Sequence, residues 1–225
     1  MRHLLIGLVL TLSVSAPACS NEPESGQLSI GVLAFDGVLT SEVTAPMEVF
    51  GAASHKDWFA SYRVLLVSGT DQKRITTAEG LKLVADATIH DDIEYEVLLV
   101  PGAYELEELT SNDTFMSFIR DKGKAAGWLG SNCSGAFLLA HAGLLDGVKA
   151  TTWAGGEADL KKAYPKVDVQ FDTNVVIDGN TITSNGGVVS YEAALTLLGR
   201  LSSPEHAQEI AEILQFTRVQ GGELR

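Results

Sequence analysis

Short apolar runs alternate with helix-like segments, and this alternation constrains the fold more than any other feature of the sequence. Strands are predicted at 28–35, 62–68, 97–100 and 125–130, and a hairpin joins 175–177 to 181–184. Helices are predicted at 41–54, 113–122, 135–142, 191–201 and 205–216. Strands with little polar alternation, separated by helices, indicate a mainly parallel sheet covered on both faces. We therefore predict an α/β three-layer sandwich that forms one domain over residues 28–225.

Composition and charge exclude several classes of protein. The chain has 225 residues, of which 45% are hydrophobic and 20% are charged, so a disordered polymer is excluded. Acidic residues outnumber basic ones by 29 to 16, which gives a formal net charge of −13. Such a chain repels phosphate backbones, and we therefore expect no nucleic-acid partner. Its two cysteines, Cys19 and Cys133, are too few for a disulfide scaffold.

The first residues have the layout of an export signal. A basic start is followed by an apolar run at 4–12 and by the small residues Ala16-Pro17-Ala18. The run is too short to span a bilayer, which takes about 20 apolar residues. Cys19 follows directly, so we predict a lipoprotein signal at 1–18, acylation of Cys19 and a polar tether at 19–27. Plain secretion and an uncleaved anchor are the alternatives.

The predicted location follows from this signal. An acylated protein of this kind is exported to the cell envelope, on the periplasmic side, and touches the membrane only through its lipid anchor. Ser20 after the cysteine favours the outer membrane. Cys133 is then the one thiol left in the folded body, where it has no partner for an internal disulfide.

The strongest local signal for chemistry is the run Gly130-Ser131-Asn132-Cys133-Ser134-Gly135. A predicted strand leads into it and a predicted helix leads out, with small residues two positions to either side of Cys133. This is the pattern of a nucleophile elbow, with cysteine in place of serine. The alternative is a small buried cysteine that packs a strand end.

An elbow has physical consequences for Cys133. Its side chain is expected at the carboxyl edge of the sheet, where open α/β folds bind ligands. The helix that begins there favours thiolate over thiol. The N–H of Ser134 is expected to point towards an oxyanion formed nearby.

Several further motifs recur in a familiar order. They are Phe35-x-Gly37, Glu42, Pro46-Met47-Glu48-Val49-Phe50, Val100-Pro101-Gly102, the Cys133 elbow, Gly143-Leu144-Leu145-x-Gly147, Ala150-Thr151-Thr152 and Thr183-Ser184. With them the chain resembles the ThiJ/PfpI superfamily over about residues 28–201. The resemblance implies a class I glutamine amidotransferase-like (flavodoxin-like) fold. The branch it resembles holds isonitrile hydratase and the amidase-like domains of AraC-type regulators, whose C-terminal helix-turn-helix is missing here.

The resemblance also implies roles for particular residues. Glu42 matches the acid that contacts the elbow cysteine, and a protonated Glu42 would donate a hydrogen bond to the Cys133 sulfur. Without the resemblance, Glu42 reads as an acid that stabilises a helix N-terminus. The rival acid Glu48 is expected to make structural hydrogen bonds. The oxyanion donors would be the N–H groups of Ser134 and Gly102.

Two positions depart from the pattern of the family. Ala103 stands where relatives usually have a second glycine, which narrows the approach of a ligand to the backbone. Trp153 stands where many relatives have a histidine, so a Cys–His–acid triad is not expected. Trp153 either walls an apolar pocket beside the thiol or packs the core. Asn185 and Gly186 either line the same pocket or form a glycine turn.

These observations predict an exported cysteine-dependent enzyme that hydrates or hydrolyses a small molecule, as isonitrile hydratase does. A redox-sensing or ligand-binding lipoprotein is the alternative, and glyoxalase- or deglycase-like action on carbonyls is a weaker one. The sequence has no metal-binding or nucleotide-binding motif, so no metal and no cofactor are expected. Relatives are often dimers, which implies a homodimer.

Overall fold

The computed structural model describes residues 26–219. The predicted signal peptide at 1–18, the acylated Cys19 and most of the predicted tether at 19–27 lie outside the described residues and stay predictions. Gln27, the last tether residue, is described, and its side chain donates a hydrogen bond to the Ala60 carbonyl at 3.0 Å.

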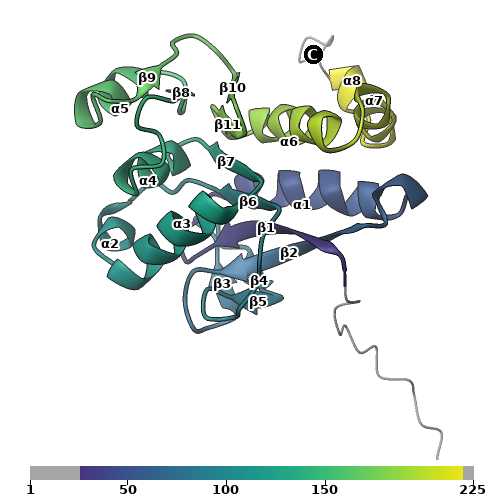
Figure 1. Ribbon diagram of the computed structural model, residues 1–225, viewed down its shortest axis with the longest axis horizontal. Coiled ribbons are helices and arrows are strands. Elements are labelled where there is room, and N and C mark those ends of the chain that lie inside the picture. Colours follow the sequence, from purple (N-terminus) through teal and green to yellow (C-terminus); the bar gives the residue numbers. More distant parts are fainter. Residues whose placement is uncertain (1–25, 220–225) are drawn as a thin grey trace, which may run out of the picture.

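A seven-stranded sheet forms the centre of the molecule (Figure 1). Its strand order is β10 (Val175–Asp178), β11 (Thr181–Ser184), β7 (Trp128–Asn132), β6 (Val97–Val100), β1 (Leu28–Ala34), β2 (Tyr62–Ser68) and β5 (Ala87–Thr88). All neighbouring strands are parallel except β10 and β11, which pair as the predicted antiparallel hairpin. The predicted mainly parallel sheet is therefore confirmed.

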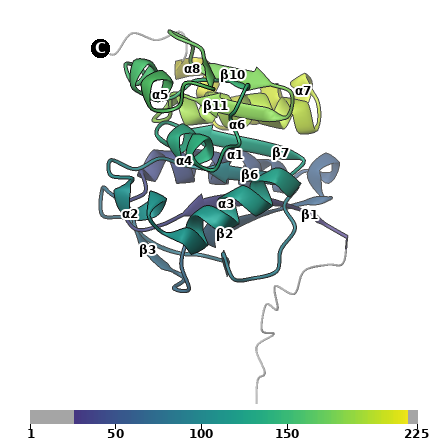
Figure 2. The ribbon, with the colours of Figure 1, turned by 60° about the vertical axis from the view of Figure 1, so that its left-hand side comes forward.

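Helices cover both faces of the sheet, as Figures 1 and 2 show. One layer contains α1 (Thr40–Ser54), α6 (Val189–Leu201) and α7 (Pro204–Ile213), which pack on one another. The opposite layer contains α3 (Asp113–Ala125) and α4 (Gly135–His141). Both layers bury apolar side chains against the sheet, because its central strands have no polar face to leave in water. The three-layer sandwich is as predicted.

The observed and predicted boundaries agree within one or two residues except at two places. The strand predicted at 125–130 begins at Trp128, because α3 runs on through Ala125. The helix predicted at 205–216 is divided into α7 and α8 (Phe216–Val219). Gln215 between them has a φ of 58°, a left-handed conformation that no α-helix continues through.

Sequence periodicity missed the smaller elements. They are the 3-10 turn η1 (Asp57–Phe59), the hairpin of β3 (Arg74–Thr76) and β4 (Lys82–Val84), the helices α2 (Glu107–Thr110) and α5 (Glu157–Ala163), and the pair of β8 (Lys149–Ala150) and β9 (Asp168–Val169). Each is too short to show a period in the sequence.

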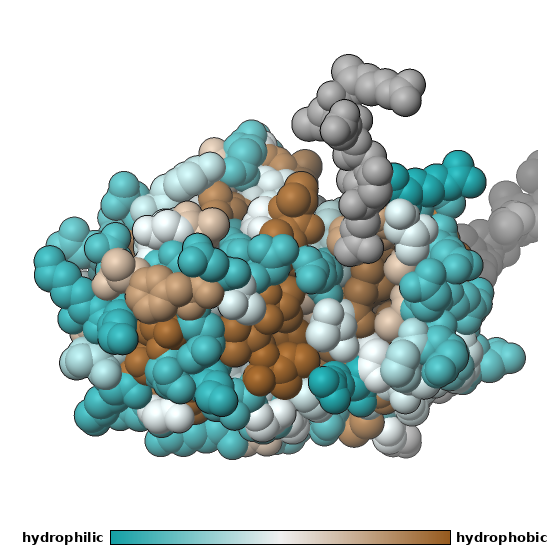
Figure 3. Space-filling view, turned by 90° about the horizontal axis from the view of Figure 1, so that it is seen from above, coloured by the Kyte–Doolittle hydropathy of each residue, from teal (hydrophilic) through white to brown (hydrophobic). Residues whose placement is uncertain are grey.

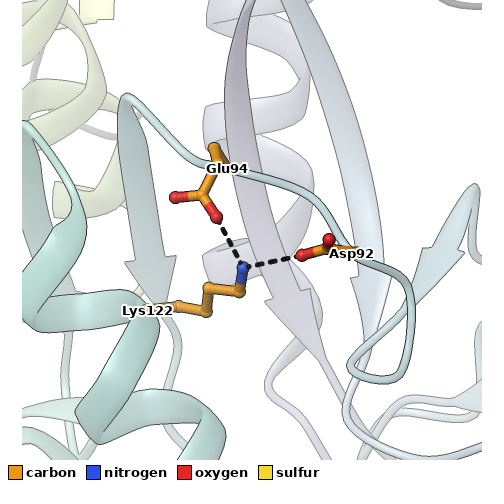
Figure 4. Close-up of polar contacts among 3 residues, drawn as sticks. All are labelled: Asp92, Glu94 and Lys122. Atoms are coloured by element: carbon orange, nitrogen blue, oxygen red, sulfur yellow. Dashed lines mark hydrogen bonds and ion pairs between the residues drawn. The ribbon is translucent and has the colours of Figure 1, made fainter.

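Ion pairs and ring stacking attach two of the outer helices to neighbouring loops. Lys122 of α3 lies between Glu94 and Asp92 of the segment before β6, at N–O distances of 3.0 and 3.5 Å (Figure 4). On the other face, the ring of His206 in α7 stacks on Trp58 with ring centroids 3.9 Å apart. These contacts hold α3 and α7 against the loops beside them.

Figure 3 shows the face that lies uppermost in Figure 1, where an apolar area near the centre is bordered by hydrophilic residues. Val188, at the start of α6, is 79% exposed.

Within residues 26–219 no helix combines the length and the apolarity that crossing a membrane would require.

Candidate functional site

The elbow predicted around Cys133 is present between β7 and α4. Cys133 has a φ of 51°, a left-handed backbone that costs a residue other than glycine about 1–2 kcal/mol. Neighbouring strands and loops hold it in this conformation. Its N–H donates to the Ser184 carbonyl at 2.9 Å, and its carbonyl accepts from the Thr152 hydroxyl at 2.8 Å. The strained turn leaves the Cys133 side chain half-buried, so that part of it stays open to solvent.

Two glycines allow the chain to pack closely around this turn. A Cβ on Gly135 would lie 3.0 Å from the Pro101 carbonyl oxygen, and a Cβ on Gly102 would lie 2.8 Å from the Ser134 nitrogen. The end of β6 and the start of α4 therefore meet at a distance that only glycine permits. This explains why small residues flank the cysteine.

Glu42 lies beside Cys133, where the family resemblance placed it. The side chain belongs to the first turn of α1 and is 1% exposed. Its Oε2 accepts a hydrogen bond from the Gly102 N–H at 2.6 Å. Its Oε1 has no hydrogen bond of standard geometry within residues 26–219 and, with the Cys133 Cβ, faces Gly186. The Cys133 thiol and the Gly187 N–H still come close enough to lower the Glu42 pKa.

A chain of hydrogen bonds fixes Glu42 from behind. Pro46 has no N–H, so the Glu42 carbonyl lacks its usual helical donor. The side-chain amide of Asn132 faces that carbonyl at 3.5 Å, and its oxygen accepts from the Ser184 hydroxyl at 2.6 Å. The same hydroxyl oxygen accepts from the Gly186 N–H at 3.2 Å. Asn132 thus connects the acid helix to the glycine loop beside the thiol.

Burial is the largest influence on the pKa values of Glu42 and Cys133. It raises the pKa of Glu42 to about 7, against the lowering effect of the Gly102 hydrogen bond. It also raises the pKa of Cys133 to about 12, and the neighbouring Glu42 charge adds to that rise. The two groups resist carrying two negative charges, so above neutral pH they keep one proton between them.

The expectation that the start of α4 favours a free thiolate is therefore wrong in direction. The Ser134 N–H does lower the Cys133 pKa, but burial and the Glu42 charge outweigh it. Nucleophilic sulfur must instead form by transfer of the thiol proton to the adjacent carboxylate.

Of the two expected oxyanion donors, the N–H groups of Ser134 and Gly102, one is occupied. The Gly102 N–H is bound to Glu42, and the Ala103 N–H donates to the Ser134 hydroxyl at 2.9 Å. That hydroxyl donates back to the Ala103 carbonyl at 2.7 Å and so holds the loop, while it also lies close enough to the Cys133 sulfur to lower the thiol pKa. These bonds overturn the oxyanion role predicted for Gly102, and they leave the neighbouring Ala103 N–H equally occupied. The Ser134 N–H, which interacts with the Cys133 sulfur, is the donor that remains.

The other expected pocket residues divide between packing and the site. The Trp153 ring stacks on Phe137, with centroids 5.0 Å apart, which is a packing contact on α4. The Asn185 side chain donates to the Thr152 and Thr173 carbonyls and so fixes its own loop. Gly186 is the member of this group that reaches the dyad.

The remaining acids and histidines lie elsewhere. Glu48 is exposed and accepts a hydrogen bond from the Tyr191 hydroxyl, the structural role expected for it. His141 contacts the Tyr164 hydroxyl at 3.2 Å, and His206 stacks on Trp58. In the part of the chain that the structure describes, no group of three His, Cys, Asp or Glu residues could hold a metal ion.

Two residues with a bearing on the site were missed by sequence reasoning. Asn132 was read only as part of the elbow, although Pro46, four residues after Glu42, signals a carbonyl in need of a donor. Glu79 lies in a turn far from the motifs, and nothing near it in the sequence points to the site. Its carboxylate accepts from the N–H and the hydroxyl of Thr40 at 2.9 and 2.6 Å.

Comparison with known proteins supports the same region. A family model described as the DJ-1/PfpI family matches residues 28–200. Isonitrile hydratase from Pseudomonas putida is 32% identical over 190 residues, which cover 84% of this chain and 78% of that protein. The HTH-type transcriptional regulator GbdR of Pseudomonas aeruginosa is 25% identical over 210 residues. Those residues cover 93% of this chain, which spans 55% of the length of the regulator.

Solved structures agree on the fold. A THiJ/PfpI family protein from Pseudomonas syringae superposes with a TM-score of 0.75 at 24% identity, over 92% of this chain and 82% of that one. DJ-1beta of Drosophila melanogaster gives a TM-score of 0.74 at 21% identity, over 84% of this chain and 98% of that one. Both contain the sheet and helix layers described above.

Proposed function

Because the chain belongs to the DJ-1/PfpI family, we propose that it is a cysteine-dependent enzyme that hydrates or hydrolyses a small electrophilic molecule. Membership of that family confirms the resemblance drawn from the sequence motifs. One observation carries the proposal. A strained elbow places a half-buried thiol directly beside a buried carboxyl group whose pKa is raised to about 7.

A carboxyl group that titrates near neutral pH can both accept and return a proton. In the first step, Glu42 takes the proton of the Cys133 thiol as the sulfur attacks the electrophilic carbon. The Ser134 N–H then faces the negative charge that develops beside the sulfur. No histidine is needed, which suits a chain with Trp153 at the position of the family histidine.

Hydration of an isonitrile, the reaction named for the Pseudomonas putida relative, is the most concrete version. Cys133 adds to the terminal carbon of R–N≡C, and Glu42 passes the thiol proton to that carbon, giving the thioimidate R–N=CH–S–Cys133. Water adds to this carbon, its released proton goes to the nitrogen, and the C–S bond breaks. The products are R–NH–CHO and the restored thiol, so one water is consumed for each formamide formed.

The test is turnover of a panel of alkyl and aryl isonitriles, with the N-substituted formamide measured by mass spectrometry. We expect formamide from the wild-type protein and from the exposed-surface control Asp121→Asn. Cys133→Ala should abolish it, and Glu42→Gln should reduce it severely. Full turnover by Cys133→Ala on every substrate that the wild type accepts would refute the proposal.

A redox-sensing role is the second candidate, and the Glu42 Oε1 atom favours it. This buried oxygen has no standard hydrogen-bond partner within residues 26–219, and in its protonated form it could donate to an oxidised sulfur beside it. The thiolate would reduce two molecules of hydrogen peroxide to water and become a sulfinate. Stoichiometric gain of two oxygens at Cys133 under mild peroxide, with no turnover on the panel, would favour sensing over catalysis.

Export, acylation of Cys19 and assembly into a homodimer are further proposals that rest on the sequence. Metabolic labelling with an alkyne fatty acid should label the full chain and fail to label Cys19→Ala. Analytical ultracentrifugation of a form beginning at residue 26 should give the mass of two chains. A monomer at micromolar concentration would contradict the dimer.

A further inference from the structure

Several loops stack at the carboxyl edge of the sheet, and one of them brings a second acid to the site. The turn 77–80 contacts the loop after β1, because the Ala78 N–H donates to the Val38 carbonyl at 2.9 Å. Val38 in turn pairs with Ala103 in the loop after β6, and Ala103 is bound to Ser134 beside the nucleophile. Glu79 therefore reaches the same edge as Cys133.

Glu79 is held in its charged form. Hydrogen bonds from the side chain and the backbone of Thr40 lower the pKa of Glu79, and the Tyr104 hydroxyl adds to this effect. The carboxylate is open to solvent. Its charge also raises the pKa of Glu42, so its field reaches the dyad. In the described part of the chain neither acid forms an ion pair with a lysine, arginine or histidine.

Arg74 and Lys82 belong to the hairpin that carries Glu79, but in the described part of the chain neither forms an ion pair with it, so no direct partner neutralises the carboxylate. Tyr104 follows Ala103 and is 75% exposed, and Val188 follows Gly187 and is 79% exposed. An approaching molecule thus meets an aromatic ring, an aliphatic side chain and one carboxylate. This arrangement lets uncharged groups pass, attracts cations and repels anions.

We propose that Glu79 is a specificity-determining residue, which makes the site favour uncharged and cationic electrophiles over carboxylates, phosphates and sulfonates. This inference rests on the proposed function, because it concerns the molecules that reach Cys133. It specifies the charge of the preferred substrate, which the proposed reaction at Cys133 and Glu42 leaves open.

The test measures how fast charged and neutral reagents modify Cys133. Methanethiosulfonates carrying a trimethylammonium, a methyl or a sulfonate group all react alike: the sulfur forms a disulfide, methanesulfinate leaves, and the thiol proton goes to solvent. Rates are read from the Cys133 peptide by mass spectrometry, so Cys19 does not interfere. Each rate is divided by that of 2-mercaptoethanol with the same reagent at the same pH.

The normalised ratio of the cationic to the anionic rate should exceed one in the wild-type protein. A unit charge that acts through about 8 Å of water separates a cation from an anion by about fivefold, so Glu79→Gln should lower the ratio by about that factor. Glutamine keeps the acceptor oxygen for Thr40. The rates are measured at pH 9, well above the Glu42 pKa of about 7, so that the Glu42–Cys133 pair carries the same charge in both proteins and does not itself change the ratio.

Two controls keep the result interpretable. Asp121→Asn removes one exposed charge from the C-terminal half of α3, which leads back to the start of β7 at the amino edge of the sheet, and should leave the ratio at the wild-type value. In 1 M NaCl the Debye length is about 3 Å, so the wild-type ratio should fall towards one without any substitution.

A wild-type ratio of one or less, or an unchanged ratio in Glu79→Gln, would overturn the role of Glu79. A thiol that none of the three reagents reaches would overturn this role and the enzyme together. Retained turnover in Cys133→Ala, with the ratio as expected, would overturn the enzyme alone.

Discussion

Replacing Glu42 with glutamine should remove most of the pH dependence of stability between pH 5.5 and pH 8. The pKa of Glu42 is raised from 4.5 to about 7, because burial disfavours the charged carboxylate. Between pH 5.5 and about 7 the unfolded chain has released that proton and the native protein still holds it. The native state therefore binds more protons, and the free energy of unfolding falls as the pH rises from 4.5 through 7.

The magnitude follows from the size of the shift. A shift from 4.5 to about 7 corresponds to about 3 kcal/mol in total, at 1.36 kcal/mol for each pKa unit. About 2 kcal/mol of this is lost between pH 5.5 and pH 8. Starting at pH 5.5 avoids the sequence pI of about 4.7, where solubility is lowest. Ending at pH 8 stays well below the Cys133 pKa of about 12.

The assay is urea denaturation of wild type and Glu42→Gln at pH 5.5, 6.5, 7.5 and 8. The free-energy difference between the variant and the wild type should move by about 2 kcal/mol in favour of the variant as the pH rises. The side-chain carbonyl of the introduced glutamine can still accept from the Gly102 N–H, so the fold should persist. Asp121→Asn should differ from the wild type by a constant amount. A constant difference for Glu42→Gln as well would refute a buried acid that titrates near neutral pH.

Three further substitutions test the geometry of the site and of its supports, each by urea denaturation at pH 7. Cys133→Gly should be more stable than Cys133→Ala by about 1 kcal/mol, since glycine adopts a φ of 51° without strain; equal stability would argue against a strained elbow. Asn132→Ala should cost about 1–3 kcal/mol, because it leaves the Glu42 carbonyl and the Ser184 hydroxyl without a partner, and a smaller loss would show that water replaces the amide. Lys122→Ala should cost less than about 1 kcal/mol, since Asp92 and Glu94 are 99% and 80% exposed, and the loss should shrink in 1 M NaCl.

The sequence predicted the long elements well, because strands such as Tyr62–Ser68 and Val97–Val100 are continuous apolar runs bounded by polar residues. It predicted the elbow because small residues flank Cys133, and the family resemblance supplied Glu42. The sequence analysis failed for the protonation state of Cys133, because that depends on which of two opposing effects is larger. The dipole of α4 and the burial of Cys133 act in opposite directions on the thiol pKa, and only the packing shows that burial prevails.

The predicted oxyanion donors failed for a related reason. Gly102 and Ala103 stand in the right loop, but the N–H of each already donates a hydrogen bond inside the protein and does not point at an oxyanion. Glu42 and Ser134 already occupy these two donors. Glu79 could not be found at all, since its proximity to the site comes from loop stacking between segments with no common motif.

All strands of the sheet except β10 share one direction, and this has a practical consequence for handling the protein. Leu28 begins β1 at one edge, while Cys133 follows β7 at the opposite edge. Seven residues of β-strand span about 23 Å, so the two edges are separated by most of the thickness of the body. A bead, a sensor chip or a fused fluorescent protein joined ahead of Leu28 would therefore leave the reactive thiol facing the bulk solution.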